Sequence, residues 1–155
     1  MSELTKRANN SIRNHTGFAM AAAIVPVPVA DVGAITLVEI DMLRALTKIY
    51  GLKWSENIGK QAIGIAAAVT IGTTIWASAA KFIPGLGTVV GGAIQMGIAG
   101  SVCWALGKAY QKHLESGGEV FDKKSFEEEL RAHVKEGKKV AKELKKDAKS
   151  GKYGK

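Results

Sequence analysis

The feature that most constrains this chain is the segment 61–107, which contains one charged side chain, Lys81. The lysine separates two uncharged stretches, Gln61–Ala80 with 20 residues and Phe82–Gly107 with 26. A helix rises about 1.5 Å per residue, so about 20 residues cross a hydrocarbon core about 30 Å thick. Both stretches reach that length. The sequence therefore predicts a transmembrane helical hairpin over residues 56–112.

The residues between the two stretches are typical of a chain reversal, because proline and glycine interrupt helices. We predict that the hairpin turn is formed by Lys81, Pro84, Gly85 and Gly87. A phosphate-binding loop is a poorer interpretation of this glycine-rich segment, since it lacks the preceding strand and the lysine–hydroxyl ending of that motif.

Small residues recur at every fourth position in both stretches, which places them on one face of each helix. Such ridges let helix backbones approach closely where lipid removes the usual hydrophobic drive. They predict helix packing or self-association, and the spacing leaves open whether the contact lies within or between chains. The positions are Gly64, Ala68, Gly72, Ala93, Gly97, Ser101 and Ala105.

A helix pair is predicted before the hairpin, over residues 3–50. The first helix, 3–24, stops at the prolines Pro26 and Pro28, because proline lacks an amide donor. Asp31 is suited to cap an amphipathic second helix over residues 31–50, which Gly51 would close.

The net charge of +8 is concentrated outside the apolar segment. Residues 119–155 alone hold 12 Lys/Arg and 8 Asp/Glu. Basic flanks favour an anionic lipid bilayer as partner, and they predict that both termini lie in the cytoplasm. Nucleic acid is not expected, since aromatic residues do not alternate with the basic ones.

The basic tail, 119–155, contains a predicted helix from 122 to 149. Its apolar side chains recur at intervals of four and three and form a thin stripe that Gly137 interrupts. Three interpretations stay open: pairing with another helix, contact with lipid headgroups, or a weakly ordered solvated tail. The chain thus divides into a membrane-associated helical domain, 1–118, and a cytoplasmic tail.

No arrangement of side chains points to catalysis, so we expect a protein that is not an enzyme and holds no cofactor or metal. The three histidines lie in separate segments without metal-site spacing, and the lone Cys103 is expected to behave as a small apolar residue. Glu39 and Asp41 are expected to face water or Arg44.

Four segments in order resemble the YcjF-like, GTPase-associated membrane domain of unknown function 697. They are Val25–Asp31, Leu43–Gly51, Phe82–Thr88 and Ala105–Gly118. The resemblance covers residues 8–140 and implies an all-helical bacterial membrane module with a separate GTPase as partner, since this chain has no phosphate loop. The matching motif positions are Pro26, Pro28, Asp31, His113, Glu115, Ser116, Gly117 and Gly118.

The fold class expected from these observations is all-α: a transmembrane hairpin, an N-terminal amphipathic helix pair and a charged C-terminal helix. The expected function is a self-assembling scaffold or docking module of the bacterial inner membrane. An oligomeric channel or pore is the first alternative, and a soluble helical regulator of a GTPase is the second.

Overall fold

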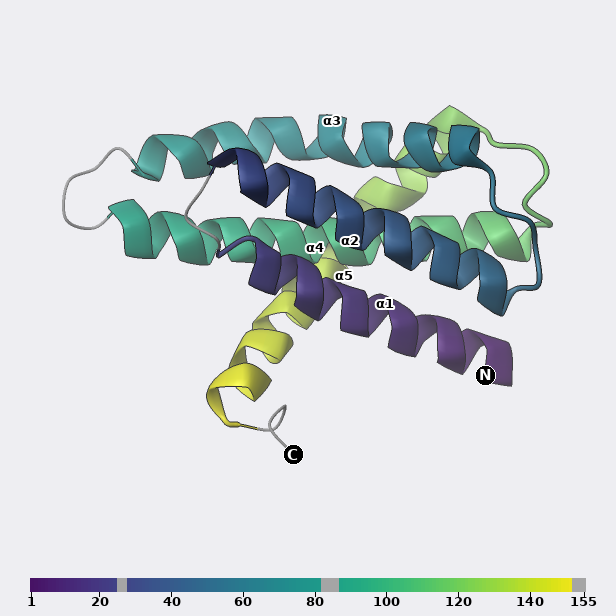
Figure 1. Ribbon diagram of the computed structural model, residues 1–155, viewed down its shortest axis with the longest axis horizontal. Coiled ribbons are helices and arrows are strands. Elements are labelled where there is room, and N and C mark those ends of the chain that lie inside the picture. Colours follow the sequence, from purple (N-terminus) through teal and green to yellow (C-terminus); the bar gives the residue numbers. More distant parts are fainter. Residues whose placement is uncertain (25–27, 82–86, 152–155) are drawn as a thin grey trace.

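The computed structural model of the protein describes the backbone of residues 1–24, 28–81 and 87–151. It describes the side chains of residues 1–24, 33–70 and 93–151. All regular structure in these ranges is helical, which confirms the all-α class (Figure 1). The helices are α1 (Glu3–Ala22), α2 (Pro28–Ile49), α3 (Glu56–Lys81), α4 (Gly87–Glu115) and α5 (Lys123–Lys149).

Helix α4 is the centre of the fold and packs against each of the other four helices. Helices α1 to α4 run roughly along the long axis of the molecule, whereas α5 crosses them at a steep angle (Figure 1). Every residue of α4 from 99 to 107 is buried. This stretch is apolar because protein surrounds it on all sides, and its largest fully buried side chain is Leu106.

The predicted transmembrane hairpin is wrong. Among the described residues, no helix has a stretch that is both long enough and apolar enough to cross a membrane. The prediction counted the absence of charge, yet membrane insertion depends on large apolar side chains such as Leu, Ile, Val and Phe. Helix α3 is rich in glycine, alanine and threonine instead, and residues 99–107 of α4 are covered by neighbouring helices.

The helix ends follow local sequence signals. Ser2 caps α1 and Asp122 caps α5, each by accepting a hydrogen bond from a backbone amide of the first turn. Gly51, with φ of 69°, ends α2 as predicted. Helix α2 begins at Pro28, so Asp31 lies in its first turn and not at the predicted capping position.

Helices α4 and α5 cross at Gly137, where the backbone of α5 comes closer to a neighbouring helix backbone than at any other glycine of the described structure. A Cβ atom on Gly137 would lie 2.4 Å from the carbonyl oxygen of Ser101 and 2.8 Å from its Cα. Gly137 is therefore the point at which α5 approaches the α4 backbone, rather than an interruption of the stripe. Of the three interpretations of this segment, the structure contains the pairing with another helix.

We predict that Gly137→Ala lowers the free energy of unfolding by about 1–3 kcal/mol, because the added methyl group would collide with the α4 backbone. Urea unfolding followed by circular dichroism measures the effect. Gly97→Ala is the matched control: a Cβ there meets no atom within 4 Å, so replacing a helical glycine should preserve or raise stability. Equal effects of both substitutions would contradict the close crossing.

Candidate functional site: a hydrophobic groove with a basic rim

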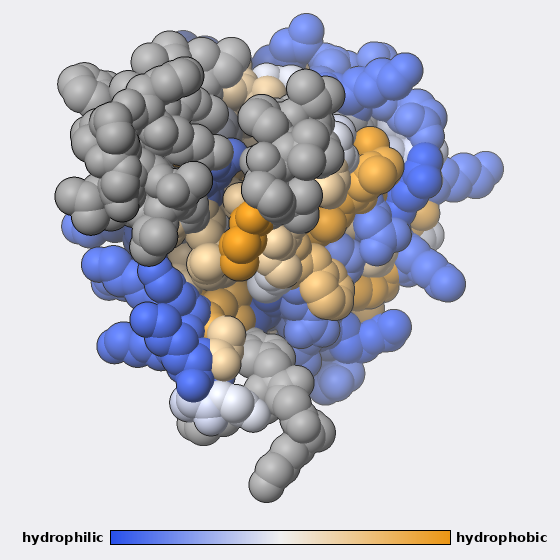
Figure 2. Space-filling model, turned by 60° about the vertical axis from the view of Figure 1, so that its left-hand side comes forward, coloured by the Kyte–Doolittle hydropathy of each residue, from blue (hydrophilic) through white to orange (hydrophobic). Residues whose placement is uncertain are grey.

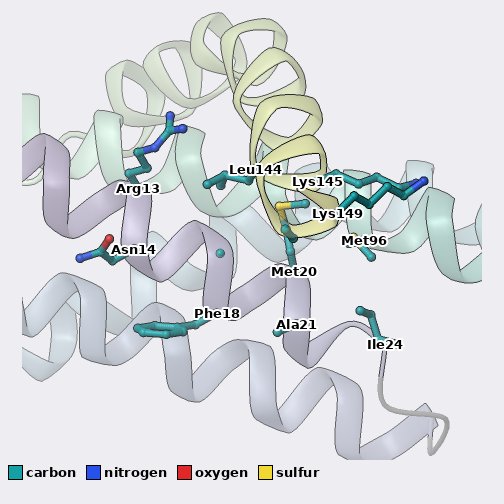
Figure 3. Close-up of a pocket in the computed structure, with 12 residues that line it drawn as sticks. Arg13, Asn14, Phe18, Met20, Ala21, Ile24, Met96, Leu144, Lys145 and Lys149 are labelled. Carbon is teal, nitrogen blue, oxygen red and sulfur yellow. The ribbon is translucent and has the colours of Figure 1, made fainter. Parts of the chain in front are cut away.

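A hydrophobic groove of about 680 Å³ lies between α1 and the C-terminal half of α5 (Figure 3). Phe18 and Met20 of α1, Ile24 just after α1, and Leu144 of α5 contribute large apolar side chains. Met96 of α4 completes the lining. Helix α5 crosses the other helices at a steep angle, and beyond the crossing at Gly137 its C-terminal half lies beside α1, where Arg13 pairs with Glu143 and Asp147.

Two lysines of α5 border this groove. Lys145 and Lys149 are separated by one helical turn and extend in the same direction past Met96 (Figure 3). Lys145 is half-buried, so its apolar stem contributes to the wall while the ammonium group stays at the edge. The result is an apolar interior with positive charge at its rim.

The carboxylates nearest to these lysines are already paired. Arg13 of α1 lies 3.3 Å from a carboxylate oxygen of Asp147 and 3.5 Å from one of Glu143. Lys145 and Lys149 have no ion-pair partner among the described side chains. The positive charge of the rim is therefore free to attract an anion.

A second hollow of about 360 Å³ adjoins the first. The two share Met20, Met96 and Lys145, and the second adds Lys138 and Lys142 of α5. Each of these lysines lies three or four residues from the next, so together they form a ladder along one side of α5. We call Lys138, Lys142, Lys145 and Lys149 the lysine ladder.

The structure corrects the expected surroundings of Glu39. Its side chain is buried in α2 and faces neither water nor Arg44, which pairs instead with Glu56 at 2.8 Å. Burial raises the pKa of the Glu39 carboxyl to about 7. Asp41 is exposed as expected and lies 3.1 Å from Nε2 of His15. Periodicity alone could have placed Glu39 near the buried Leu43 and Leu46.

The predicted packing ridges lie in different surroundings. Ser101 and Ala105 of α4 are buried within the fold. Gly64 and Ala68 of α3 are exposed, and a Cβ on Gly64 would meet no atom within 4 Å. Gly97 has the same open space, and Ala93 is half-buried. The surroundings of Gly72 lie outside the described side chains.

The predicted turn residues border the connection between α3 and α4. Lys81 is the last residue of α3 and Gly87 the first of α4, whereas Pro84 and Gly85 lie outside the described residues. Pro26 also lies outside them. The side chain of Asp31 is not described.

The motif residues from His113 to Gly118 lie at the C-terminal end of α4. Gly118 donates its amide to the carbonyl of His113, and both Gly117 and Gly118 have positive φ, so they end the helix. The hydroxyl of Ser116 also donates to the His113 carbonyl, at 2.8 Å. The carboxylate of Glu115 accepts a hydrogen bond of 2.6 Å from the hydroxyl of Tyr50, which ties α4 to the end of α2.

Cys103 is fully buried, and burial raises the pKa of its thiol well above the usual range. Its sulfur lies 3.9 Å from that of Met42, as expected of a small apolar residue in a core.

Comparison with known proteins assigns this chain to a family. Residues 1–139 match the family described as Domain of unknown function (DUF697). The chain belongs to the DUF697 family. This DUF697 chain is 34% identical over 133 residues to magnetosome membrane protein 22 of Magnetospirillum gryphiswaldense, and the match covers 83% of the chain and 67% of that protein. No solved structure matches the chain.

We predict that Glu39 makes the DUF697 fold less stable as pH rises. Its carboxyl titrates near pH 7 when folded and near 4.5 when unfolded, so the folded state binds more protons between these values. The free energy of unfolding should fall by up to about 3 kcal/mol across this interval, and Glu39→Gln should remove that fall.

Urea unfolding at a series of pH values measures this effect, with Glu128→Gln, an exposed acid on α5, as the control. An unchanged pH profile in the Glu39→Gln variant would show that the pKa of the Glu39 carboxyl is not raised in the folded state.

Proposed function

We propose that this DUF697 protein is a non-enzymatic docking module that binds an anionic membrane surface peripherally. The observation that carries the proposal is the combination of exposed apolar side chains and unpaired lysines on one part of the molecule. Proteins that lie on membranes without crossing them combine apolar contact with electrostatic attraction to anionic lipids.

The apolar part of the proposed membrane-binding surface lies on one half of the helix bundle. Helix α1 ends, α2 begins, α3 ends and α4 begins at the same end of the molecule (Figure 1). Phe18, Leu37 and Ile94 belong to the helix halves nearest this end, Ile24 follows the end of α1, and each of the four is exposed. Figure 2 shows hydrophobic surface in the middle of one face, with hydrophilic residues to its right and lower left. Exposed apolar surface of this kind is typical of an interaction site.

The basic part of the proposed membrane-binding surface is the lysine ladder. Between Lys138 and Lys149 the chain has six lysines and two acids, and Arg13 pairs with both acids. Each basic residue near an anionic membrane surface contributes about 1 kcal/mol of attraction. The ladder therefore supplies the electrostatic part of the proposed binding.

The relative in Magnetospirillum gryphiswaldense supports a membrane location, since it is named as a magnetosome membrane protein. The bacterial inner membrane stays the predicted location. The predicted orientation, with both termini in the cytoplasm, presupposed the transmembrane hairpin and loses its basis with it. The channel or pore alternative relied on the same hairpin and is not retained.

Self-association is part of the proposal. Gly64 and Ala68 leave a face of α3 that no other described helix covers, and Gly97 of α4 is also open. Small residues at this spacing allow helices of two chains to approach closely. Docking of a separate GTPase, which the family resemblance implies, stays a prediction.

We predict that the purified chain binds vesicles containing phosphatidylglycerol and not vesicles of phosphatidylcholine alone. Lys145→Glu/Lys149→Glu should weaken binding by about tenfold or more, because two attractions become repulsions. Cosedimentation measures the bound fraction. The matched control, Lys123→Glu/Lys124→Glu, changes net charge equally at the other end of α5 and should bind nearly as the unmodified chain does. Absence of binding, or equal loss in both variants, would contradict the proposal.

We predict that Gly64→Leu and Gly97→Leu reduce the mass of the oligomer measured by light scattering. A Cβ at either position meets no atom within 4 Å in the single chain, so the substitutions should disturb contacts between chains while leaving the fold intact. Gly33→Leu, at an exposed position of α2 with no atom within 4 Å, is the control. An oligomer of unchanged mass in both variants would remove these ridges from the interface.

A further inference from the structure

We propose that the groove between α1 and α5 binds one acyl chain of an anionic phospholipid, with its phosphate against Lys145 and Lys149. This inference rests on the proposed membrane function and deepens it, because it assigns one lipid molecule to a defined site. General attraction to a charged surface needs no such site, so the two statements can fail separately.

The volume and lining of the groove suit an acyl chain. At about 680 Å³, it lies within the range of about 300–1,000 Å³ that single small molecules occupy. Gly17 and Ala21 lie one turn apart on α1 and leave space along the helix, while Met20 and Met96 offer flexible, polarisable walls. An unbranched, flexible hydrocarbon is the kind of ligand that such a lining accommodates.

The charged side chains that line the groove are Arg13, Lys145 and Lys149, all of them basic, and the polar Asn14 is neutral. The ammonium groups of Lys145 and Lys149 lie beside an apolar interior, and Arg13 holds Asp147 and Glu143 in ion pairs. An ordinary apolar ligand would leave both ammonium groups unpaired. A ligand with an apolar tail and an anionic head satisfies the interior and the rim together, and this charge complementarity selects an anionic phospholipid.

The position of the groove also fits lipid entry. Phe18 and Ile24 form part of its lining, and both are exposed on the half of the bundle that carries the proposed membrane surface. A lipid in the membrane leaflet that contacts the protein would therefore reach the groove without crossing the polar side of α5.

Lysophosphatidylglycerol below its critical micelle concentration separates this site from vesicle binding. Titration calorimetry of the purified chain should give one bound molecule per chain. Lysophosphatidylcholine with the same acyl chain, and glycerophosphoglycerol without one, should each bind about tenfold more weakly or worse, because each lacks one of the two required parts.

Gly17→Leu tests the groove directly. Gly17 lines the groove and a Cβ there meets no atom within 4 Å, so we expect a leucine to extend into the groove without disturbing the fold. Lysophosphatidylglycerol affinity should fall by about tenfold or more, while vesicle binding is largely kept. Gly33→Leu makes the same change outside the groove and should retain both activities. Lys145→Gln/Lys149→Gln should abolish the preference for phosphatidylglycerol over phosphatidylcholine headgroups.

The outcomes are distinguishable. Vesicle binding without lysophosphatidylglycerol binding would overturn the groove site and leave the proposed function standing. Unchanged lysophosphatidylglycerol affinity in the Gly17→Leu variant would also overturn it. Crosslinking from Phe18 or Leu144 to a second copy of the chain, with no lipid bound, would assign the groove to a protein partner instead.

Discussion

The close approach of α5 to α4 at Gly137 is the contact on which the candidate site depends. With no side chain at this position, the α5 backbone reaches the carbonyl of Ser101, and the apolar stripe of α5 then covers α4. Because the two helices cross steeply, the C-terminal half of α5 lies beside α1, and the groove lies between them. The same crossing places Lys145 and Lys149 at the rim. A larger residue at Gly137 would move the wall, the rim and the lysine ladder together.

The central position of α4 explains why its sequence resembles that of a membrane helix. A helix that protein covers on every side and a helix that lipid covers both need a continuous apolar surface. Here four other helices take the place of lipid around residues 99–107. The two kinds of helix differ in the size of their apolar side chains. Alanine and glycine are uncharged, but they contribute little hydrophobic free energy.

Sequence reasoning predicted the elements well where local signals decide them. Gly51 ends α2 with positive φ, and the C-terminal helix spans Lys123–Lys149, so the predicted end of the one and extent of the other are confirmed. It failed where tertiary packing decides. Glu39 is polar yet buried, and Gly137 is a contact point that sequence reasoning treated as an interruption. The groove joins residues more than 100 positions apart, so no spacing within one segment could reveal it.

Peripheral attachment is the central claim, and alkaline carbonate extraction tests it most directly. Membranes from cells that produce the chain should be washed with carbonate, and the chain should then be measured in pellet and supernatant. Attachment through the lysine ladder and the groove predicts release into the supernatant, because high pH removes much of the lysine charge. Complete retention in the pellet would contradict peripheral binding.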